Sequence, residues 1–179
     1  MSAALLVIDV QRLLCEGRWA VHDAAGVIAR INTLSRRARE AGVPVIVVQH
    51  EEAGGPMARG SEGWQLAAGL ETAPSDTLVG KATCDSFHKT QLGALLEAKG
   101  VRTLVVCGMQ TDFCVDTTVR RALALGYGIT LVTDAHSTLG NGVLEAPQII
   151  AHHNATLANI DSFGPRVRPV PATEVRFDG

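Results

Sequence analysis

The run Val101-Arg-Thr-Leu-Val-Val-Cys-Gly-Met-Gln-Thr-Asp-Phe-Cys-Val115 joins an apolar strand to a helix through a polar turn. Its β-branched first half is typical of a strand that is buried on both faces. A cysteine that opens a helix directly after such a strand lies near backbone N–H groups and the positive end of the helix dipole, and both favour the thiolate. Cys114 is therefore a candidate nucleophile, and the alternative is a small core residue.

The same alternation of apolar and amphipathic runs extends along the whole chain. The predicted strands are residues 4–10, 45–50, 77–80, 103–108 and 128–134. The predicted helices are residues 23–41, 90–99, 114–125 and 146–157. This order is typical of an α/β domain in which helices cover both faces of a parallel sheet.

Composition describes one ordinary soluble domain. The 179 residues are 46% hydrophobic and carry a net charge of -2, and a chain of this length can bury roughly 70% of its unfolded surface. Because the charge balance has no basic bias, and Lys and Arg are scattered apart from Arg36-Arg37 and Arg120-Arg121, nucleic acid is not an expected partner. No apolar run approaches the ~20 residues of a membrane span, and no basic leader precedes the first strand, so a cytoplasmic protein is expected.

The four cysteines show no CxxC pair and no framework spacing. They are Cys15, Cys84, Cys107 and Cys114. In a chain that can build a full core, this pattern favours reduced thiols.

Polar residues follow the ends of several predicted strands. Asp9 and Gln11 come after the first strand, His50 after the second and Lys81 after the third. If the strand order is 3-2-1-4-5, Asp9 and Cys114 lie on neighbouring strands, at the edge where open α/β sheets bind ligands. A carboxylate at the end of so apolar a strand is costly unless it is paired, and Lys81 offers a partner. The alternative is a structural ion pair or a helix cap.

Four motifs together resemble one known family. They are Leu-Val-Ile-Asp9-Val-Gln11, Lys81-Ala-Thr-Cys-Asp-Ser86-Phe87, Gly108-Met-Gln-Thr111-Asp-Phe-Cys114-Val115 and Val132-Thr-Asp134-Ala135. In this order they resemble the isochorismatase-like cysteine hydrolases of the nicotinamidase/isochorismatase superfamily, over nearly the whole chain. The resemblance implies a single domain over residues 1–179. Its fold would be a three-layer α/β/α Rossmann-like arrangement with a six-stranded parallel sheet of order 3-2-1-4-5-6.

The resemblance also implies a site and a reaction. Asp9, Lys81 and Cys114 would form a catalytic triad, and the backbone N–H groups of Gln110 and Cys114 would form an oxyanion hole. The Met109–Gln110 peptide bond would be cis. The expected reaction is the cleavage of a C–N, amide-type bond of a small molecule through a thioester acyl-enzyme.

A pocket for that substrate is expected beside the triad. Its walls are predicted to include Gln11, Leu14, Trp64, Phe87 and Phe113. Residues 51–75 form the longest stretch without periodicity, which is typical of a lid or binding loop; the alternative is a contact between subunits. Trp64 in this loop either closes over the substrate or packs against another subunit.

No metal or other cofactor is expected. Nicotinamidases in the family hold a metal with an Asp and two His after the second strand, whereas this chain has Gln49-His50-Glu51-Glu52 and no further His until His88. His50 is therefore expected to line the pocket. His152 and His153 are expected at the surface or an interface, since adjacent helical residues point about 100° apart.

Several functions remain open. The leading hypothesis is a metal-independent cysteine amidohydrolase. The alternatives are an isochorismatase-type vinyl ether hydrolase, which can dispense with the cysteine, and a catalytically silent module that binds a small ligand. A thiol redox protein would need Cys107 or Cys84 near Cys114. Dinucleotide binding is disfavoured because no G-x-G-x-x-G follows the first strand.

Assembly is expected only from the resemblance, which implies a homodimer or homotetramer. The C-terminal helix and the proline-rich residues 165–171 are the candidate contacts.

Overall fold

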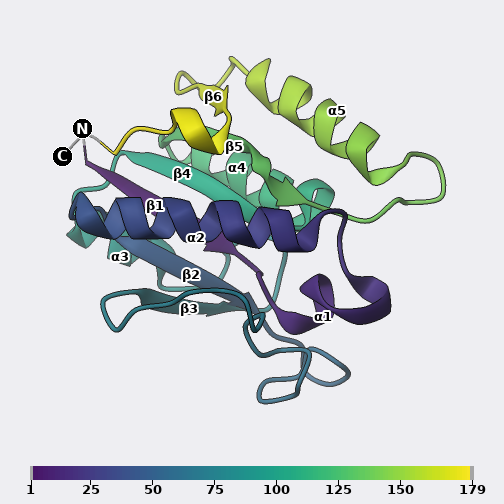
Figure 1. Ribbon diagram of the computed structural model, residues 1–179. Coiled ribbons are helices and arrows are strands. Elements are labelled where there is room, and N and C mark those ends of the chain that lie inside the picture. Colours follow the sequence, from purple (N-terminus) through teal and green to yellow (C-terminus); the bar gives the residue numbers. More distant parts are fainter. Residues whose placement is uncertain (1, 178–179) are drawn as a thin grey trace.

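A computed structural model of the chain, which describes residues 2–177, contains a six-stranded sheet whose neighbouring strands are all parallel (Figure 1). The strands are β1 (Ala3–Ile8), β2 (Val45–His50), β3 (Thr77–Lys81), β4 (Thr103–Met109), β5 (Gly128–Ser137) and β6 (Val167–Val170). Their order across the sheet is β3-β2-β1-β4-β5-β6. The predicted fold class and strand order are confirmed.

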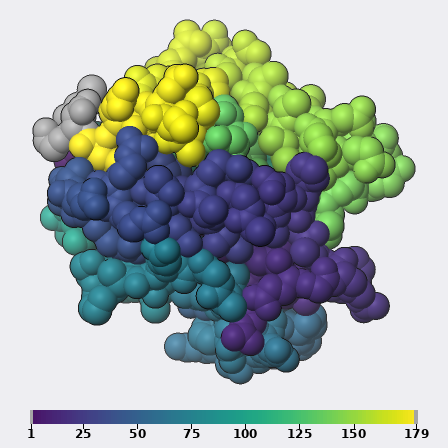
Figure 2. Space-filling model, in the orientation of Figure 1, coloured from purple at the N-terminus to yellow at the C-terminus, as the bar shows by residue number. Residues whose placement is uncertain are grey.

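Helices cover both faces of this sheet and give the fold three layers (Figure 1). Helix α2 (Ala24–Glu40) lies across the side of the molecule that Figure 2 shows. The helices are α1 (Arg12–Cys15), α2 (Ala24–Glu40), α3 (Leu92–Ala98), α4 (Asp116–Ala124) and α5 (Ala146–Ala158). The shorter helical turns are η1 (Gly17–Trp19), η2 (Thr111–Val115) and η3 (Ala172–Glu174). No helix within residues 2–177 combines the length and the apolar character needed to cross a membrane.

The central strand β1 is apolar throughout because it faces two cores. Leu5 and Val7 pack with α2, whereas Leu6 and Ile8 pack with α3 and α4. Alternate side chains of a strand point to opposite faces, so burial on both faces requires an unbroken apolar run. The strand then ends at the polar residue Asp9, which leaves the carboxylate at the edge of the sheet.

The proline-rich segment 165–171, which the sequence offers only as a candidate subunit contact, contains strand β6. Val167–Val170 pairs with residues 129–132 of β5, and Pro169 lies opposite Leu131. Proline lacks a backbone N–H, and sheets tolerate it on an edge strand such as this one. The segment is therefore part of the sheet.

Cys114 does not open a helix, in contrast to the sequence-based expectation. Thr111–Val115 forms a π-helical turn in which the Val115 N–H donates to the Gln110 carbonyl at 3.1 Å, and α4 begins only at Asp116. Turns of this kind are wider than an α-helical turn and are frequent at functional sites. The thiol consequently lies before the helix whose dipole was expected to act on it.

The segment 51–75 contains no helix or strand, as predicted. Isolated bridges join Gln11 to Leu66 and Glu52 to Ala58. The first of these bridges ties the segment to the residues that follow β1, beside the edge where the candidate site lies.

Gly108 allows β4 to approach β1 closely, just before the candidate site. Its φ is +117°, and a Cβ at this position would collide with the main chain of Ile8. We expect Gly108→Ala to lower the free energy of unfolding by about 3–5 kcal/mol, because it combines backbone strain with overpacking between two strands. Urea denaturation will measure the loss.

Gly100→Ala is the matched control for this prediction. Gly100 also has a positive φ, +63°, but its missing Cβ would meet open space. Strain alone should cost about 1–2 kcal/mol there. Equal losses in the two variants would show that the contact between the strands contributes nothing.

Candidate active site

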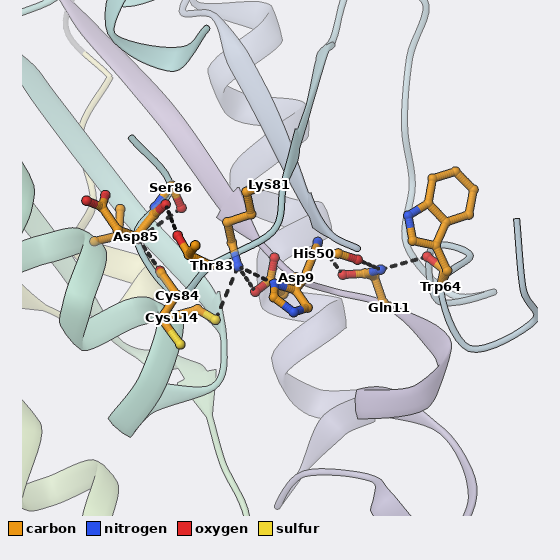
Figure 3. A network of polar contacts seen from close by, with 11 residues as sticks. Asp9, Gln11, His50, Trp64, Lys81, Thr83, Cys84, Asp85, Ser86 and Cys114 are labelled. Atoms are coloured by element: carbon orange, nitrogen blue, oxygen red, sulfur yellow. Dashed lines mark hydrogen bonds and ion pairs between the residues drawn. The ribbon is translucent and has the colours of Figure 1, made fainter. Parts of the chain in front are cut away.

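Asp9, Lys81 and Cys114 come from three different strand ends and meet in one buried cluster (Figure 3). The Lys81 Nζ atom lies 2.7 Å from Asp9 Oδ2 and 3.2 Å from Cys114 Sγ. The exposed fractions of the three residues are 1%, 2% and 8% for Asp9, Lys81 and Cys114. The structure thus brings together the three side chains that the sequence singles out.

Lys81 is held by three acceptors, which matches the three hydrogens of its ammonium group. The third acceptor is Nδ1 of His50, at 3.3 Å. Burial works against the charge, yet Asp9 and Cys114 raise the pKa of Lys81 above its ordinary value. A buried ammonium group with a carboxylate partner stays charged, so Lys81 supplies a fixed positive charge to the cluster.

Asp9 presents one carboxylate oxygen that has no hydrogen-bond partner. Oδ2 accepts from Lys81, whereas Oδ1 is buried and unpaired within residues 2–177. The residue has a φ of 49°, an uncommon conformation for aspartate that occurs at turns and functional sites. Since a buried unpaired carboxylate oxygen is costly, it is suited to accept a proton during a reaction.

The pKa of Cys114 is raised, in contrast to the lowered pKa that a helix N-terminus was expected to give. Burial is the first cause that raises the pKa of Cys114 and the charge of Asp9 is the second, while Lys81 opposes them. Deprotonation of the thiol therefore requires a base within the site.

The expected cis peptide bond between Met109 and Gln110 is cis in the structure. The Gln110 carbonyl accepts the N–H groups of Phe113 and Val115, which orients the turn that carries Cys114. The assignment of the Gln110 and Cys114 N–H groups to an oxyanion hole stays a prediction.

The Gln11 side chain, which is predicted to line the pocket, forms hydrogen bonds with main-chain groups, and its place in a pocket wall stays a prediction. Its buried amide group donates to the carbonyls of His50 and Trp64 at 2.9 and 2.7 Å, and its Oε1 accepts the His50 N–H at 2.8 Å (Figure 3). We call this arrangement the Gln11 clamp. It fixes the end of β2 and the loop 51–75 to a residue three positions after the end of β1.

The predicted aromatic walls lie in different places. Phe87 is partly buried against the core, and the centre of its ring lies 5.8 Å from that of Tyr127, which directly precedes β5. Phe113 is 52% exposed. Trp64 is half-buried, and its main-chain carbonyl is held by Gln11 and Gln49.

Leu14 does line a cavity, of about 710 Å³, that reaches the turn before Cys114. Its lining residues are Leu13, Leu14, Arg18, Trp19, Pro56, Gln110 and Leu139. The loop 51–75 thus contributes Pro56 to this cavity. Sequence reasoning missed Trp19 because a tryptophan in a short irregular segment gives no sign of the direction in which its ring points.

A second network of hydrogen bonds, which the sequence did not reveal, contacts the π-helical turn at Thr111. Thr111 Oγ1 lies 2.8 Å from His136 Nδ1, and His136 Nε2 lies 2.9 Å from Asn154 Oδ1. The Asn154 amide also donates to the Thr133 carbonyl, so its oxygen faces the histidine. Burial lowers the pKa of His136 to about 4, and the ring is neutral at physiological pH.

Residues 2–177 contain no group of three or more His, Cys, Asp or Glu side chains placed to hold a metal ion. His50 uses one ring nitrogen for Lys81. His152 is exposed and His153 is half-buried, with their rings 5.3 Å apart at nearly right angles.

Comparisons with known proteins agree on one family. A family model described as the Isochorismatase domain matches residues 3–162. The streptothricin hydrolase of Streptomyces noursei is 44% identical over 136 residues, which cover 75% of this chain and 49% of that protein. The ureidoacrylate amidohydrolase RutB of Methylobacterium radiotolerans is 32% identical over 208 residues, which cover 95% of this chain and 77% of that protein.

Solved structures point the same way. A crystal structure of an isochorismatase family protein has a TM-score of 0.85 and 38% identity, and the match covers 94% of this chain and 97% of that one. The chain spans about half the length of the streptothricin hydrolases that it matches.

Proposed function

Because this chain belongs to the isochorismatase family, we propose that it is a cysteine hydrolase that cleaves a C–N, amide-type bond of a small molecule. The observation that carries the proposal is the cluster of Asp9, Lys81 and Cys114, in which a buried thiol lies beside a cation and an unpaired carboxylate oxygen. A protonated thiol and a base within the same closed site are what covalent acyl transfer needs.

In the first half of the reaction, Asp9 takes the proton of Cys114 as the sulfur attacks the carbonyl carbon of the amide. The C–S bond forms, and the carbonyl oxygen becomes an oxyanion that the N–H groups of Gln110 and Cys114 are proposed to bind. Asp9 then gives its proton to the amine nitrogen as the C–N bond breaks. The products of this half are a free amine and a thioester.

In the second half, a water molecule replaces the amine. Asp9 accepts a proton from the water as its oxygen attacks the thioester, and the thiolate leaves and regains a proton from Asp9. Lys81 keeps its proton throughout. Its positive charge stabilises the carboxylate of Asp9, and it stabilises the thiolate of Cys114 when Asp9 holds the proton. The cluster therefore always pairs one positive with one negative charge.

The position of the sulfur favours this chemistry over vinyl ether hydrolysis. An acid-catalysed cleavage of a vinyl ether needs the carboxyl group but has no use for a thiol, whereas here Cys114 Sγ lies 3.2 Å from the ammonium that would stabilise a thiolate. The similarity to RutB, a ureidoacrylate amidohydrolase, also favours a C–N bond.

The cavity beside Gln110 is the proposed entrance for the substrate. Its lining is mainly apolar and includes one charged residue, Arg18, whose guanidinium carbon lies 4.9 Å from the centre of the Trp19 ring. A volume of about 710 Å³ suits a small organic molecule. Assembly into a homodimer or homotetramer stays a prediction that light scattering will check.

Alkylation of the four cysteines tests the proposal without a known substrate. Between pH 6 and 8, iodoacetamide labelling of Cys114, followed by peptide mass spectrometry, should change little with pH, because the proton moves to Asp9 rather than to solvent. The labelling rate of a free cysteine derivative in the same solution should rise about tenfold with each increase of one pH unit, as long as the pH stays below its pKa near 8.5. Lys81→Met should slow the labelling of Cys114 at least about tenfold, since it removes the charge that favours the thiolate.

The other thiols provide internal controls. Cys15, whose pKa burial raises to about 12, should label very slowly, as should the fully buried Cys107. The half-buried Cys84 reports access to this side of the molecule. Labelling of Cys114 with the pH slope of the free thiol and no response to Lys81→Met would contradict the covalent mechanism.

A further inference from the structure

His50 contacts the catalytic cluster from the neighbouring strand. It is the last residue of β2 and pairs in register with Lys81 of β3. Its Nδ1 atom lies 3.3 Å from Lys81 Nζ (Figure 3). Because an ammonium group can only donate, Nδ1 must accept, and the ring hydrogen is on Nε2.

The position of the His50 ring is itself determined by the fold. The Gln11 clamp binds both the N–H and the carbonyl of His50. A lysine side chain is long and flexible, so its ammonium group needs such a fixed acceptor if it is to stay in one place.

We propose that His50 is a positioning residue for Lys81: its neutral ring accepts one ammonium hydrogen and keeps the cation beside the thiol of Cys114. This inference rests on the proposed function of the cluster. Without His50, one buried N–H of Lys81 has no partner, and the ammonium group shifts away from the sulfur toward another acceptor.

The charges that face the ring agree with a neutral histidine. Burial first and the charge of Lys81 second lower the pKa of His50, while Asp9, Glu52 and the Thr83 main chain work in the opposite direction. As the pH falls through this lowered pKa, His50 gains a proton, loses its acceptor atom and repels Lys81. The labelling rate of Cys114 should therefore fall at acid pH, over the range in which His50 gains its proton.

Two amide variants separate this role from a general structural one. His50→Asn places an oxygen close to the position of Nδ1, whereas His50→Gln carries the same amide group one methylene further out, toward the position of Nε2. Both keep a polar side chain at the strand end. His50→Leu removes the acceptor altogether, and His88→Asn, at an exposed histidine, is the control for the labelling itself.

The measurement is the rate of iodoacetamide labelling of Cys114 between pH 4.5 and 8.5, with Cys84 as the internal reference. We expect His50→Gln and His50→Leu to lower the rate at pH 7.5 by about tenfold, which is the effect of one pKa unit on the thiolate population. His50→Asn should retain most of the rate, and its acid-side decline should move to lower pH because the titrating ring is gone. His88→Asn should label as the wild type does.

Two results would overturn the inference. If His50→Gln labels as fast as the wild type, Lys81 does not depend on His50. If His50→Asn falls as far as His50→Gln, the loss follows from disturbing the strand end and not from losing an acceptor at Nδ1. These outcomes differ from a failure of the proposed function, which would show as an unactivated Cys114 in the wild type itself.

Discussion

Cys114→Ala is expected to lower kcat by at least about 10⁴-fold, because the variant has no atom that can form the acyl-enzyme. The assay uses whichever amide the wild type hydrolyses fastest in a screen of ureido, carbamoyl and lactam compounds. Binding of that amide, measured by calorimetry, should remain, since the cavity residues are unchanged. The matched variant Cys114→Ser should also be inactive, because a hydroxyl group is a much weaker acid than a thiol.

Three outcomes distinguish the functions that the sequence leaves open. Wild-type turnover by Cys114→Ala would contradict the covalent mechanism. A variant that still cleaves a vinyl ether would indicate acid catalysis by Asp9 alone. A wild-type protein that binds amides but hydrolyses none of them would indicate a silent binding module.

The second large effect concerns the buried ion pair of Asp9 and Lys81. Asp9→Asn and Lys81→Met should each lower the free energy of unfolding by about 3–5 kcal/mol, because each leaves one buried charge without its partner. The double variant should regain most of this loss, since no charge is then buried. Urea denaturation of all four proteins measures the cycle.

Activity should not follow stability in this cycle. Each single variant is expected to lose about 10²–10⁴-fold in kcat, and the double variant should be no better, because neither base nor cation is restored. Recovery of activity together with stability would mean that the pair only supports the fold. A double variant as unstable as the single variants would mean that the site tolerates no apolar replacement.

The pH dependence of this stability follows from the raised pKa of Lys81. The pKa of a lysine is about 10.5 in the unfolded chain. A lysine with a higher pKa in the folded protein contributes its full stabilisation at pH values below about 10.5. The contribution is lost only as the pH rises through the higher folded pKa. Through the neutral range the pair therefore stays intact.

Most strands of the sheet could be predicted from the sequence, because they are nearly unbroken runs of apolar residues. β1 is apolar throughout because both of its faces are covered. The sequence pattern did not predict β6, because Pro165, Pro169 and Pro171 are typical of an irregular tail. A strand at the edge of a sheet nevertheless accepts proline. The strand order and the sixth strand came from the resemblance and not from the periodicity.

The candidate site was only partly predictable for a related reason. Asp9, Lys81 and Cys114 stand at strand ends, which topology brings together, and the structure places them in contact. The direction of the pKa shift of Cys114 was misjudged because the extent of its burial leaves no mark in the sequence. The hydrogen bonds of Gln11 were not predicted, because the sequence pattern of a glutamine at a strand end is the same whether its side chain faces a ligand or the main chain.

The Gln11 clamp has a consequence for divergence within such proteins. It holds the loop 51–75 through the Trp64 carbonyl, and the end of β2 through the main chain of His50. Since it binds no side chain of the loop, substitutions there can accumulate without releasing the anchor. The side chains of the loop can thus vary while the proposed catalytic residues keep an unchanged framework.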